Sequence, residues 1–272
     1  MYSIGIFDSG YGGLTVFKEI AAQLPQYDYI YLGDNARSPY GTRSFETIYD
    51  YTWQCVQQLF NMDCHLVILA CNTASAKALR NIQQLNLPKF GDNRRVLGVI
   101  RPTAEVIGNY SKTQKVGILA TEGTIKSNSY VMEIKNQFPS CEIFQQSCPM
   151  WVPLIENNEQ DSAGADYFVK KYLKQLLNQS KDIDTLLLAC THYPLLLPKI
   201  KEHVPKHIKV IEQGNIVAQS LADYLQRHQE IEQQCSKNNK RTFFTTENPQ
   251  NFNEKATLFV GYKIEATQLH IS

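Results

Sequence analysis

Two cysteines have nearly identical surroundings in distant parts of the sequence. Residues 66–75 read LVILACNTAS and residues 186–194 read LLLACTHYP, so each short apolar run ends in Ala-Cys and is followed by hydroxyl residues. Short apolar runs of this kind favour buried strands, and ligands of open α/β sheets bind beyond the carboxyl ends of the strands. We therefore expect Cys71 and Cys190 to face one substrate as an acid/base pair.

Such a pair suits the inversion of a stereocentre that carries a C–H bond beside a carboxylate. Inversion needs a base on one face and an acid on the other, and the roles exchange in the reverse direction. A thiol with an ordinary pKa of about 8.5 reaches both protonation states near neutral pH, whereas a carboxylate would stay ionised and serve badly as the acid. Helices that begin after Thr73 and Thr191 would favour the thiolate through their N-terminal N–H groups.

Other chemistries fit parts of the same pattern. His192, two residues after Cys190, suits a cysteine hydrolase in which the histidine is the general base, but that scheme leaves Cys71 unused. A non-catalytic amino-acid sensor with a binding cleft, or small residues that simply pack well at a sheet edge, would use neither thiol. A pyridoxal cofactor would need a Schiff-base lysine and a phosphate cup, and nothing near Lys77 resembles a cup.

The elements that would position these cysteines alternate along the chain. The patterns predict parallel strands covered on both faces by helices, hence an α/β fold. The glycine turn that begins at Asp8 lacks the third glycine of the dinucleotide fingerprint, and no phosphate-loop lysine follows, so no nucleotide cofactor is expected. Strands are predicted at residues 3–7, 27–32, 66–70, 96–100, 116–120, 142–147, 186–189, 209–211 and 242–245, and helices at 14–24, 44–60, 74–85, after 102, 124–138, 161–177 and 216–227.

Two such runs, each with its own Ala-Cys strand, indicate two similar lobes with a pseudo-twofold relation and the ligand in the cleft between them. A polar stretch at residues 91–95 marks the boundary. We expect the first lobe to contain residues 1–95 with 210–272, and the second to contain 96–209. Residues 148–156 are expected to form an apolar loop that ends in an acid.

Composition excludes several classes of protein. The net charge of +1 gives no electrostatic footprint for nucleic acid, and no apolar run approaches the roughly 20 residues that span a bilayer. Residue 1 is followed at once by a predicted strand, so we expect no secretory signal and a soluble, cytoplasmic protein. Seven cysteines without a Cys-x-x-Cys pair indicate free thiols rather than a disulfide frame or a metal site.

The motifs resemble, in their order, those of the glutamate racemase family of the aspartate/glutamate racemase superfamily. The resemblance extends over nearly the whole chain. It rests on residues 8–15 (DSGYGGLT), 33–37 with 39–41, 70–75, 120–121 with 123–124, 152–156 and 189–194.

This resemblance implies interconversion of L- and D-glutamate without a cofactor, with the D-glutamate used for peptidoglycan, and a homodimer as the assembly. It implies that Cys71 removes the proton from D-glutamate and Cys190 from L-glutamate. An aspartate racemase of the same superfamily stays open as the alternative. Further roles implied by the resemblance are catalysis or tuning for Asp8, Glu156 and His192, substrate binding for Asp8, Ser9, Pro39, Tyr40, Gly41, Asn72, Thr73, Thr121, Thr191 and His192, and support for Asp34.

Overall fold

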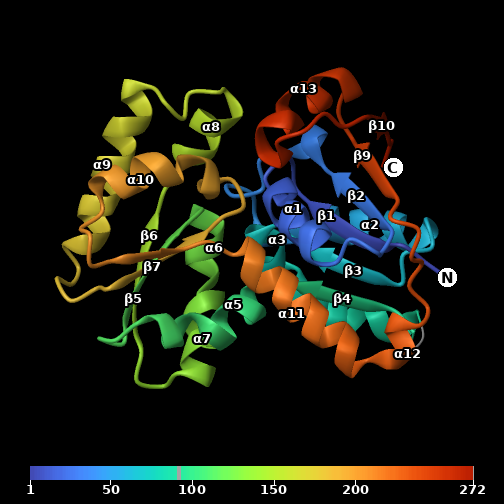
Figure 1. The fold of residues 1–272 in the computed structure, drawn as a ribbon, viewed down its shortest axis with the longest axis horizontal. Helices are drawn as coiled ribbons and strands as arrows, with labels where there is room; N and C mark the ends of the chain where they lie inside the picture. Colours follow the sequence, from blue (N-terminus) through green and yellow to red (C-terminus); the bar gives the residue numbers. More distant parts are fainter. Residues whose placement is uncertain (91–92, 272) are drawn as a thin grey trace.

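Two parallel β-sheets, each covered by helices, form the protein (Figure 1). The computed structural model describes residues 1–90 and 93–271. The first sheet has six strands in the order β10-β9-β2-β1-β3-β4, and every pairing in it is parallel. Its strands are β1 (Ile4–Asp8), β2 (Tyr29–Gly33), β3 (Leu66–Leu69), β4 (Arg95–Gly98), β9 (Arg241–Thr245) and β10 (Ala266–Gln268).

The second sheet has four parallel strands in the order β6-β5-β7-β8. Its strands are β5 (Lys115–Ala120), β6 (Glu142–Ser147), β7 (Thr185–Ala189) and β8 (Lys209–Ile211). This order repeats the β2-β1-β3-β4 part of the first sheet, as expected for two similar lobes. We call the part built on the six-stranded sheet the first lobe and the part built on the four-stranded sheet the second lobe.

The repeated order places the two cysteines at equivalent points. In each sheet the first strand is flanked by the second strand on one side and the third on the other. The order therefore reverses between the first and third strands of each sheet. The carboxyl ends of these two strands form a topological switch point, where α/β proteins bind ligands. Cys71 follows β3 beside β1, and Cys190 follows β7 beside β5, so both lie at a switch point.

Helices cover the sheets and connect the lobes (Figure 1). Helix α11 returns the chain from the second lobe and packs against α1 of the first. No helix of the described residues is long and apolar enough to cross a membrane. The helices are α1 (Gly13–Gln23), α2 (Phe45–Asn61), α3 (Asn72–Lys77), α4 (Leu79–Asn81), α5 (Ile100–Ile107), α6 (Glu122–Ser127), α7 (Ser129–Gln137), α8 (Trp151–Glu156), α9 (Ala163–Leu177), α10 (Leu197–His203), α11 (Gly214–Arg227), α12 (Gln229–Glu232) and α13 (Pro249–Val260).

The structure corrects three local expectations. Residues 151–156, predicted as a loop, form α8, because Trp151 and Ile155 lie one turn apart and are both buried. The single helix predicted over 124–138 is two helices, since Asn128 adopts a left-handed conformation with φ of 53°. The predicted helix over 74–85 begins earlier, at Asn72, and is interrupted at Ala78 before a π-helical turn, Ile82–Asn86.

The division into lobes at residues 95 and 209 stays a prediction, although the sheets assign the strands at both boundaries. Strand β4 pairs with β3 in the first lobe, instead of beginning the second, because it continues the parallel ladder beside Val67. Strand β8 pairs with β7 in the second lobe. Residues 91 and 92 of the predicted boundary stretch lie outside the described residues.

Candidate active site

Both switch points open onto one small cavity. Cys71 and Cys190 line the same hollow of ≈ 90 Å³, and their side chains are close enough for the charge of Cys190 to raise the pKa of Cys71. Both residues are buried, at 5% and 6% exposure. A ligand there would therefore contact both thiols in a site where little of either cysteine is exposed to solvent.

Most of the predicted site residues line this cavity, and the sequence-based reasoning missed several others. Asp8, Asp34 and Glu156 do not line it. The predicted lining residues are Ser9, Pro39, Tyr40, Gly41, Cys71, Asn72, Thr73, Thr121, Cys190, Thr191 and His192. The missed ones are Ser38, Thr42, Glu122, Cys148, Pro149, Val152 and Pro153. Cys148 follows β6, so the strand-end rule that selected the other two cysteines could have found it.

Cys71 caps the helix that follows it. Its Sγ accepts a hydrogen bond from the Ala74 amide at 3.4 Å and lies 3.4 Å from the Ser9 hydroxyl. Burial, and then the charge of Asp8, raise the pKa of the Cys71 thiol to about 12, although both hydrogen bonds act in the opposite direction. The expected lowering by the helix N-terminus is therefore present but outweighed, and Cys71 rests as a thiol.

Cys190 has no such helix start. A 3-10 turn, Tyr193–Leu196, follows it and α10 begins only at Leu197, so the predicted helix dipole at Cys190 is wrong. Its polar neighbour is His192 instead. Pro194 fits the first turn of a 3-10 segment because it needs no N–H partner there.

His192 joins Cys190 to Glu156. Its Nε2 lies 2.9 Å from Glu156 Oε1. Burial alone would lower the pKa of His192, but hydrogen bonding to Cys190 and Glu156 outweighs burial and raises that pKa to about 10. The imidazole is therefore a cation at neutral pH, and it places positive charge on the Cys190 side of the cavity.

The glycine turn after β1 receives the Cys190 loop from the other lobe. A Cβ atom at Gly12 would lie 2.3 Å from both His192 Nδ1 and Thr191 Oγ1, so only glycine fits. The Thr15 hydroxyl, one turn into α1, donates to the Thr191 carbonyl at 2.8 Å. The glycine turn thus allows His192 and Thr191 to approach the backbone of the first lobe closely.

Asp8 lies near Cys71 but does not line the cavity. It is fully buried, and its Oδ2 accepts the Gly10 amide at 2.9 Å. Its Oδ1 has no hydrogen-bond partner among the described residues. Burial raises the pKa of Asp8, while the positive charge of His192 opposes part of that shift.

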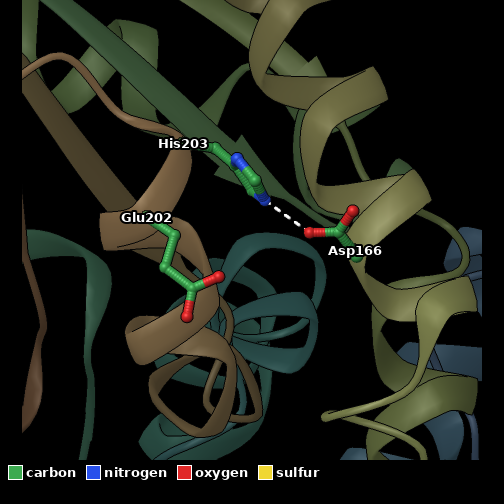
Figure 2. A group of neighbouring side chains, drawn as sticks. All are labelled: Asp166, Glu202 and His203. Atoms are coloured by element: carbon green, nitrogen blue, oxygen red, sulfur yellow. Dashed lines mark hydrogen bonds and ion pairs between the residues drawn. The ribbon is translucent and has the colours of Figure 1, made fainter.

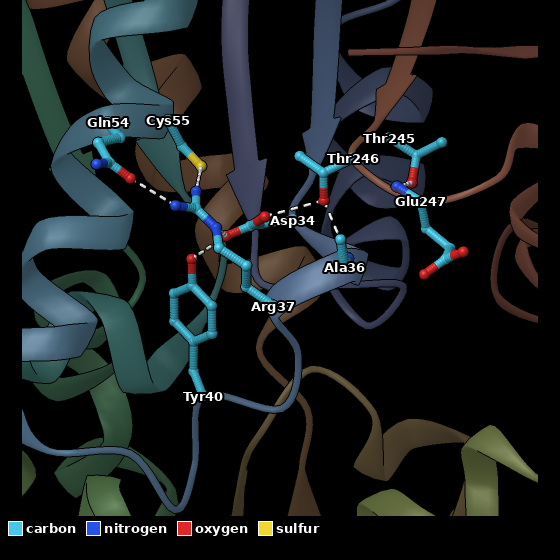
Figure 3. Close-up of polar contacts among 9 residues, drawn as sticks. All are labelled: Asp34, Ala36, Arg37, Tyr40, Gln54, Cys55, Thr245, Thr246 and Glu247. Carbon is cyan, nitrogen blue, oxygen red and sulfur yellow. Dashed lines mark hydrogen bonds and ion pairs between the residues drawn. The ribbon is translucent and has the colours of Figure 1, made fainter. Parts of the chain in front are cut away.

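Asp34 supports the loop that carries Pro39 to Gly41 to the cavity (Figure 3). It is fully buried and bonds Arg37 Nε at 2.7 Å, the Thr246 hydroxyl at 2.9 Å and the Tyr40 hydroxyl. Because the Tyr40 hydroxyl is engaged with Asp34, Tyr40 offers a ligand its ring or backbone. Asp34 therefore anchors the loop, and its role in supporting the reaction stays a prediction.

Hydroxyl groups from both lobes meet at the cavity. Thr73 Oγ1 lies 2.9 Å from Thr121 Oγ1, and Thr124 Oγ1 lies 3.1 Å from Thr121 Oγ1. The Gly123 amide donates to the Gly41 carbonyl at 2.9 Å across the same boundary. These contacts hold the lobes together around donors that suit a carboxylate.

The larger hollow of the molecule carries no comparable chemistry. A groove of ≈ 950 Å³ runs along α3, α4, α5 and α11, and neither Cys71 nor Cys190 lines it. Its charged groups are largely paired, as in Arg101 with Glu105 at 3.0 Å. Chemistry, not size, therefore identifies the smaller cavity as the candidate active site.

One group of described residues has metal-ligand chemistry (Figure 2). Asp166 on α9 and Glu202 and His203 on α10 bring their ligand atoms within 4.8 Å of one another. His203 Nε2 already bonds Asp166 Oδ1 at 2.6 Å, and Lys170 occupies Oδ2 at 2.8 Å. None of the three residues lines the cavity of the cysteines, so this group offers that site no metal.

Comparison with known proteins shows extensive similarity. The family model described as Asp/Glu/Hydantoin racemase matches residues 4–221. A glutamate racemase of Sulfurihydrogenibium sp. is 40% identical, over 98% of both chains. Among solved structures, a glutamate racemase isoform of Bacillus anthracis is similar with a TM-score of 0.90 at 34% identity, over 99% of this chain and 98% of that one. The Francisella tularensis glutamate racemase in complex with D-glutamate has a TM-score of 0.87 at 30% identity, over 99% and 98% of the two chains.

Proposed function

The chain belongs to the Asp/Glu/hydantoin racemase family, and within it to the glutamate racemases, and on this premise we propose a two-thiol interconversion of L- and D-glutamate without a cofactor. The observation that carries the proposal is the presence of both strand-end cysteines on one small cavity. The complex of a similar enzyme with D-glutamate supports the choice of substrate.

In the proposed reaction Cys190 takes the α-proton of L-glutamate and Cys71 delivers a proton to the opposite face of the same carbon. A pKa of about 12 keeps Cys71 protonated, so it is ready to be the acid in this direction. In the reverse direction the Cys71 thiolate takes the proton of D-glutamate and Cys190 returns one. One turnover leaves Cys190 as the thiol and Cys71 as the thiolate, which is the state that the reverse reaction needs. A second turnover in the same direction first requires Cys190 to lose a proton to solvent and Cys71 to gain one.

The barrier is the weak acidity of the α-carbon, because each unit of pKa mismatch between thiol and carbon acid costs about 1.4 kcal/mol. A positioned base supplies only about 10²–10⁴-fold, so the larger share must come from donors aimed at the developing charge in a cavity with little water. We assign this part to Ser9, Thr73, Thr121 and Thr191. On the Cys190 side, the His192 cation balances the charge that develops during transfer.

The proposal also gives Asp8 a role. Its carboxyl group has a raised pKa and does not line the cavity, but it lies close enough to Cys71 to raise the pKa of that thiol, so the ammonium of a substrate beside Cys71 would also attract it. Approach of that cation would offset the charge that now opposes Cys71 ionisation. Asp8 would then help Cys71 to act as a base only when substrate is bound.

We further propose that the D-glutamate serves peptidoglycan synthesis, and the family resemblance is the support for this role. Deleting the gene should make growth depend on added D-glutamate. Growth of the deletion strain without it, and with an intact cell wall, would contradict the role.

The reaction itself is tested by the loss of optical rotation of L-glutamate in the purified protein, with L-aspartate in parallel. Cys71→Ala and Cys190→Ala should each abolish racemisation, while Cys235→Ala, which changes a buried cysteine outside the cavity, should not. If aspartate is racemised and glutamate is not, aspartate is the substrate. Racemisation that survives in Cys71→Ala would contradict the two-thiol mechanism. If the wild type racemises neither amino acid, a hydrolase in which Cys190, His192 and Glu156 act together becomes the candidate, and amides and esters are then the substrates to test.

A further inference from the structure

Beside Cys71, three buried side chains from distant parts of the chain close a ring of hydrogen bonds. Asn72 Nδ2 donates to Gln213 Oε1 at 2.8 Å, Gln213 Nε2 donates to the Tyr130 hydroxyl at 2.6 Å, and that hydroxyl donates to Asn72 Oδ1 at 2.5 Å. All three residues are at most 4% exposed. Neither Tyr130 nor Gln213 lines the cavity, but Asn72 does.

The direction of this ring is fixed from outside it. The Thr103 hydroxyl donates to the Val99 carbonyl at 3.0 Å, so its oxygen is left to accept from Gln213 Nε2 at 2.9 Å. With the Gln213 amide turned round, its oxygen would face the Val99 carbonyl, now 3.4 Å from Nε2, and two acceptors would meet in a buried site. Gln213 must therefore donate to Tyr130, and the Tyr130 hydroxyl must donate to Asn72.

The consequence concerns which atom Asn72 presents to a ligand. Since Tyr130 holds the amide oxygen of Asn72 and Gln213 accepts one hydrogen of Nδ2, the second hydrogen of Nδ2 remains to donate into the cavity. A substrate carboxylate needs a donor there. If the amide rotated, its oxygen would face the carboxylate and repel it. The ligand would then lose a hydrogen bond to a charged group, which is among the strongest in proteins.

The ring also joins the two lobes. Asn72 begins α3 of the first lobe, Tyr130 lies in α7 of the second, and Gln213 directly precedes α11, which connects them. The Asn72 amide is therefore fixed as a donor only when the two lobes are packed together as they are in this structure.

We propose that Tyr130 and Gln213 are positioning residues that fix the Asn72 amide as a donor to a substrate carboxylate. This inference rests on the proposed function, because it takes a dicarboxylic amino acid as the ligand. It assigns both residues a role in binding that acts only through Asn72.

The test is Tyr130→Phe, with Tyr29→Phe as the matched control. Tyr29 is equally buried, at 1% exposure, and its hydroxyl donates to the Leu24 carbonyl away from the cavity. Glutarate, which carries both carboxylates of glutamate and has no stereocentre, is titrated calorimetrically, and glutamate KM and kcat are measured in parallel. Tyr130→Phe should weaken glutarate binding and raise KM by roughly tenfold or more, with a smaller change in kcat. Tyr29→Phe should leave both within about twofold while losing similar thermal stability.

A second variant, Gln213→Met, breaks the ring at another member while preserving volume. In the double variant the loss of glutarate affinity should be smaller than the product of the two single losses, because either change breaks the same ring. Glutarate binding that is equal in Tyr130→Phe and Tyr29→Phe, or absent from the wild type, would overturn the inference. Glutarate binding needs no turnover, so its weakening in Tyr130→Phe would support the ring even in a protein that failed to racemise glutamate.

Discussion

Cys71 and Cys190 follow equivalent strands, yet their surroundings differ in charge. Cys71 lies near the buried carboxyl of Asp8, whereas Cys190 lies beside the His192 cation. Two thiols that are alike in sequence are therefore made unlike by a neighbour on each side. We therefore expect a substitution near His192 to affect the Cys190 side of the site without changing the surroundings of Cys71.

Glu156→Gln should move the basic limb of the pH profile of kcat/KM to lower pH. His192 has a pKa of about 10 in the folded protein, above its ordinary 6.5, and Glu156 is one cause of that increase. The stabilisation from this raised pKa is fully present below about pH 6.5 and is lost as the pH rises through about 10. The stability deficit of Glu156→Gln in urea unfolding should therefore shrink between pH 6 and pH 10. An unmoved basic limb, or one moved equally by Glu105→Gln on the surface, would contradict this role.

At the scale of elements, close approach matters more than the composition of a turn. Gly12 directly precedes α1, at the point where the His192 ring of the other lobe approaches the backbone. The sequence pattern did not predict this contact, because its partners lie far along the chain. Such long-range contacts, including the buried partners of Asn72, cannot be read from local spacing.

Gly12→Ala should lower kcat/KM by roughly 100-fold or more, since a displaced catalytic group commonly loses that much. Its new methyl group would displace His192 or Thr191. The control is Gly164→Ala in α9, where the added Cβ has its nearest atom at 3.4 Å. This control should gain up to about 1 kcal/mol of stability with unchanged kinetics, because alanine is the better helix former. Activity of Gly12→Ala near that of the wild type would show that the close contact at Gly12 does not position His192 and Thr191.

The loop of residues 34–41 depends on its buried anchor (Figure 3). Arg37→Met would leave Asp34 buried without its cation, and breaking such a pair destabilises by about 3–5 kcal/mol. Arg101→Met removes an exposed pair with Glu105 and should change stability by less than about 1 kcal/mol. Urea unfolding of both variants measures the difference. Equal losses in the two variants would show that the Asp34 network does not hold the loop.

Much of the element pattern followed from the sequence, because apolar runs and glycine turns are local signals. The β3 and β7 strands, their cysteines and the two-sheet architecture were predicted in this way. Strand β4 follows the predicted boundary at residue 95 yet pairs with β3, and β8 spans the predicted boundary at residue 209 yet pairs with β7. Sheet membership is decided by pairing and not by chain order. The helix expected after Cys190 failed because two prolines, Pro194 and Pro198, favour a 3-10 turn before α10.

At the scale of the whole molecule, the cavity is a property of the pair of lobes. Cys71 and Thr73 belong to one lobe, and Thr121 and Cys190 belong to the other. A ligand that contacts both lobes must stabilise their association as well as their folds. The expected homodimer and the cytoplasmic location stay predictions.

Glutamate should therefore raise the melting temperature of the protein. Saturation at about 100 times Kd corresponds to about 2.7 kcal/mol of added stability. L-aspartate, one methylene shorter, should give a smaller shift at equal concentration in differential scanning calorimetry. A larger shift with aspartate would reverse the choice of substrate.

The most direct test of the central claim follows deuterium during the first few per cent of racemisation of L-glutamate in D₂O. If two thiols on opposite faces do the chemistry, the D-glutamate formed carries deuterium at the α-carbon, because Cys71 delivers a solvent-derived proton. The recovered L-glutamate keeps its original hydrogen, because Cys190 can return only the proton that it took. D-glutamate that retains the original hydrogen, or equal early labelling of both enantiomers, would contradict the two-thiol account.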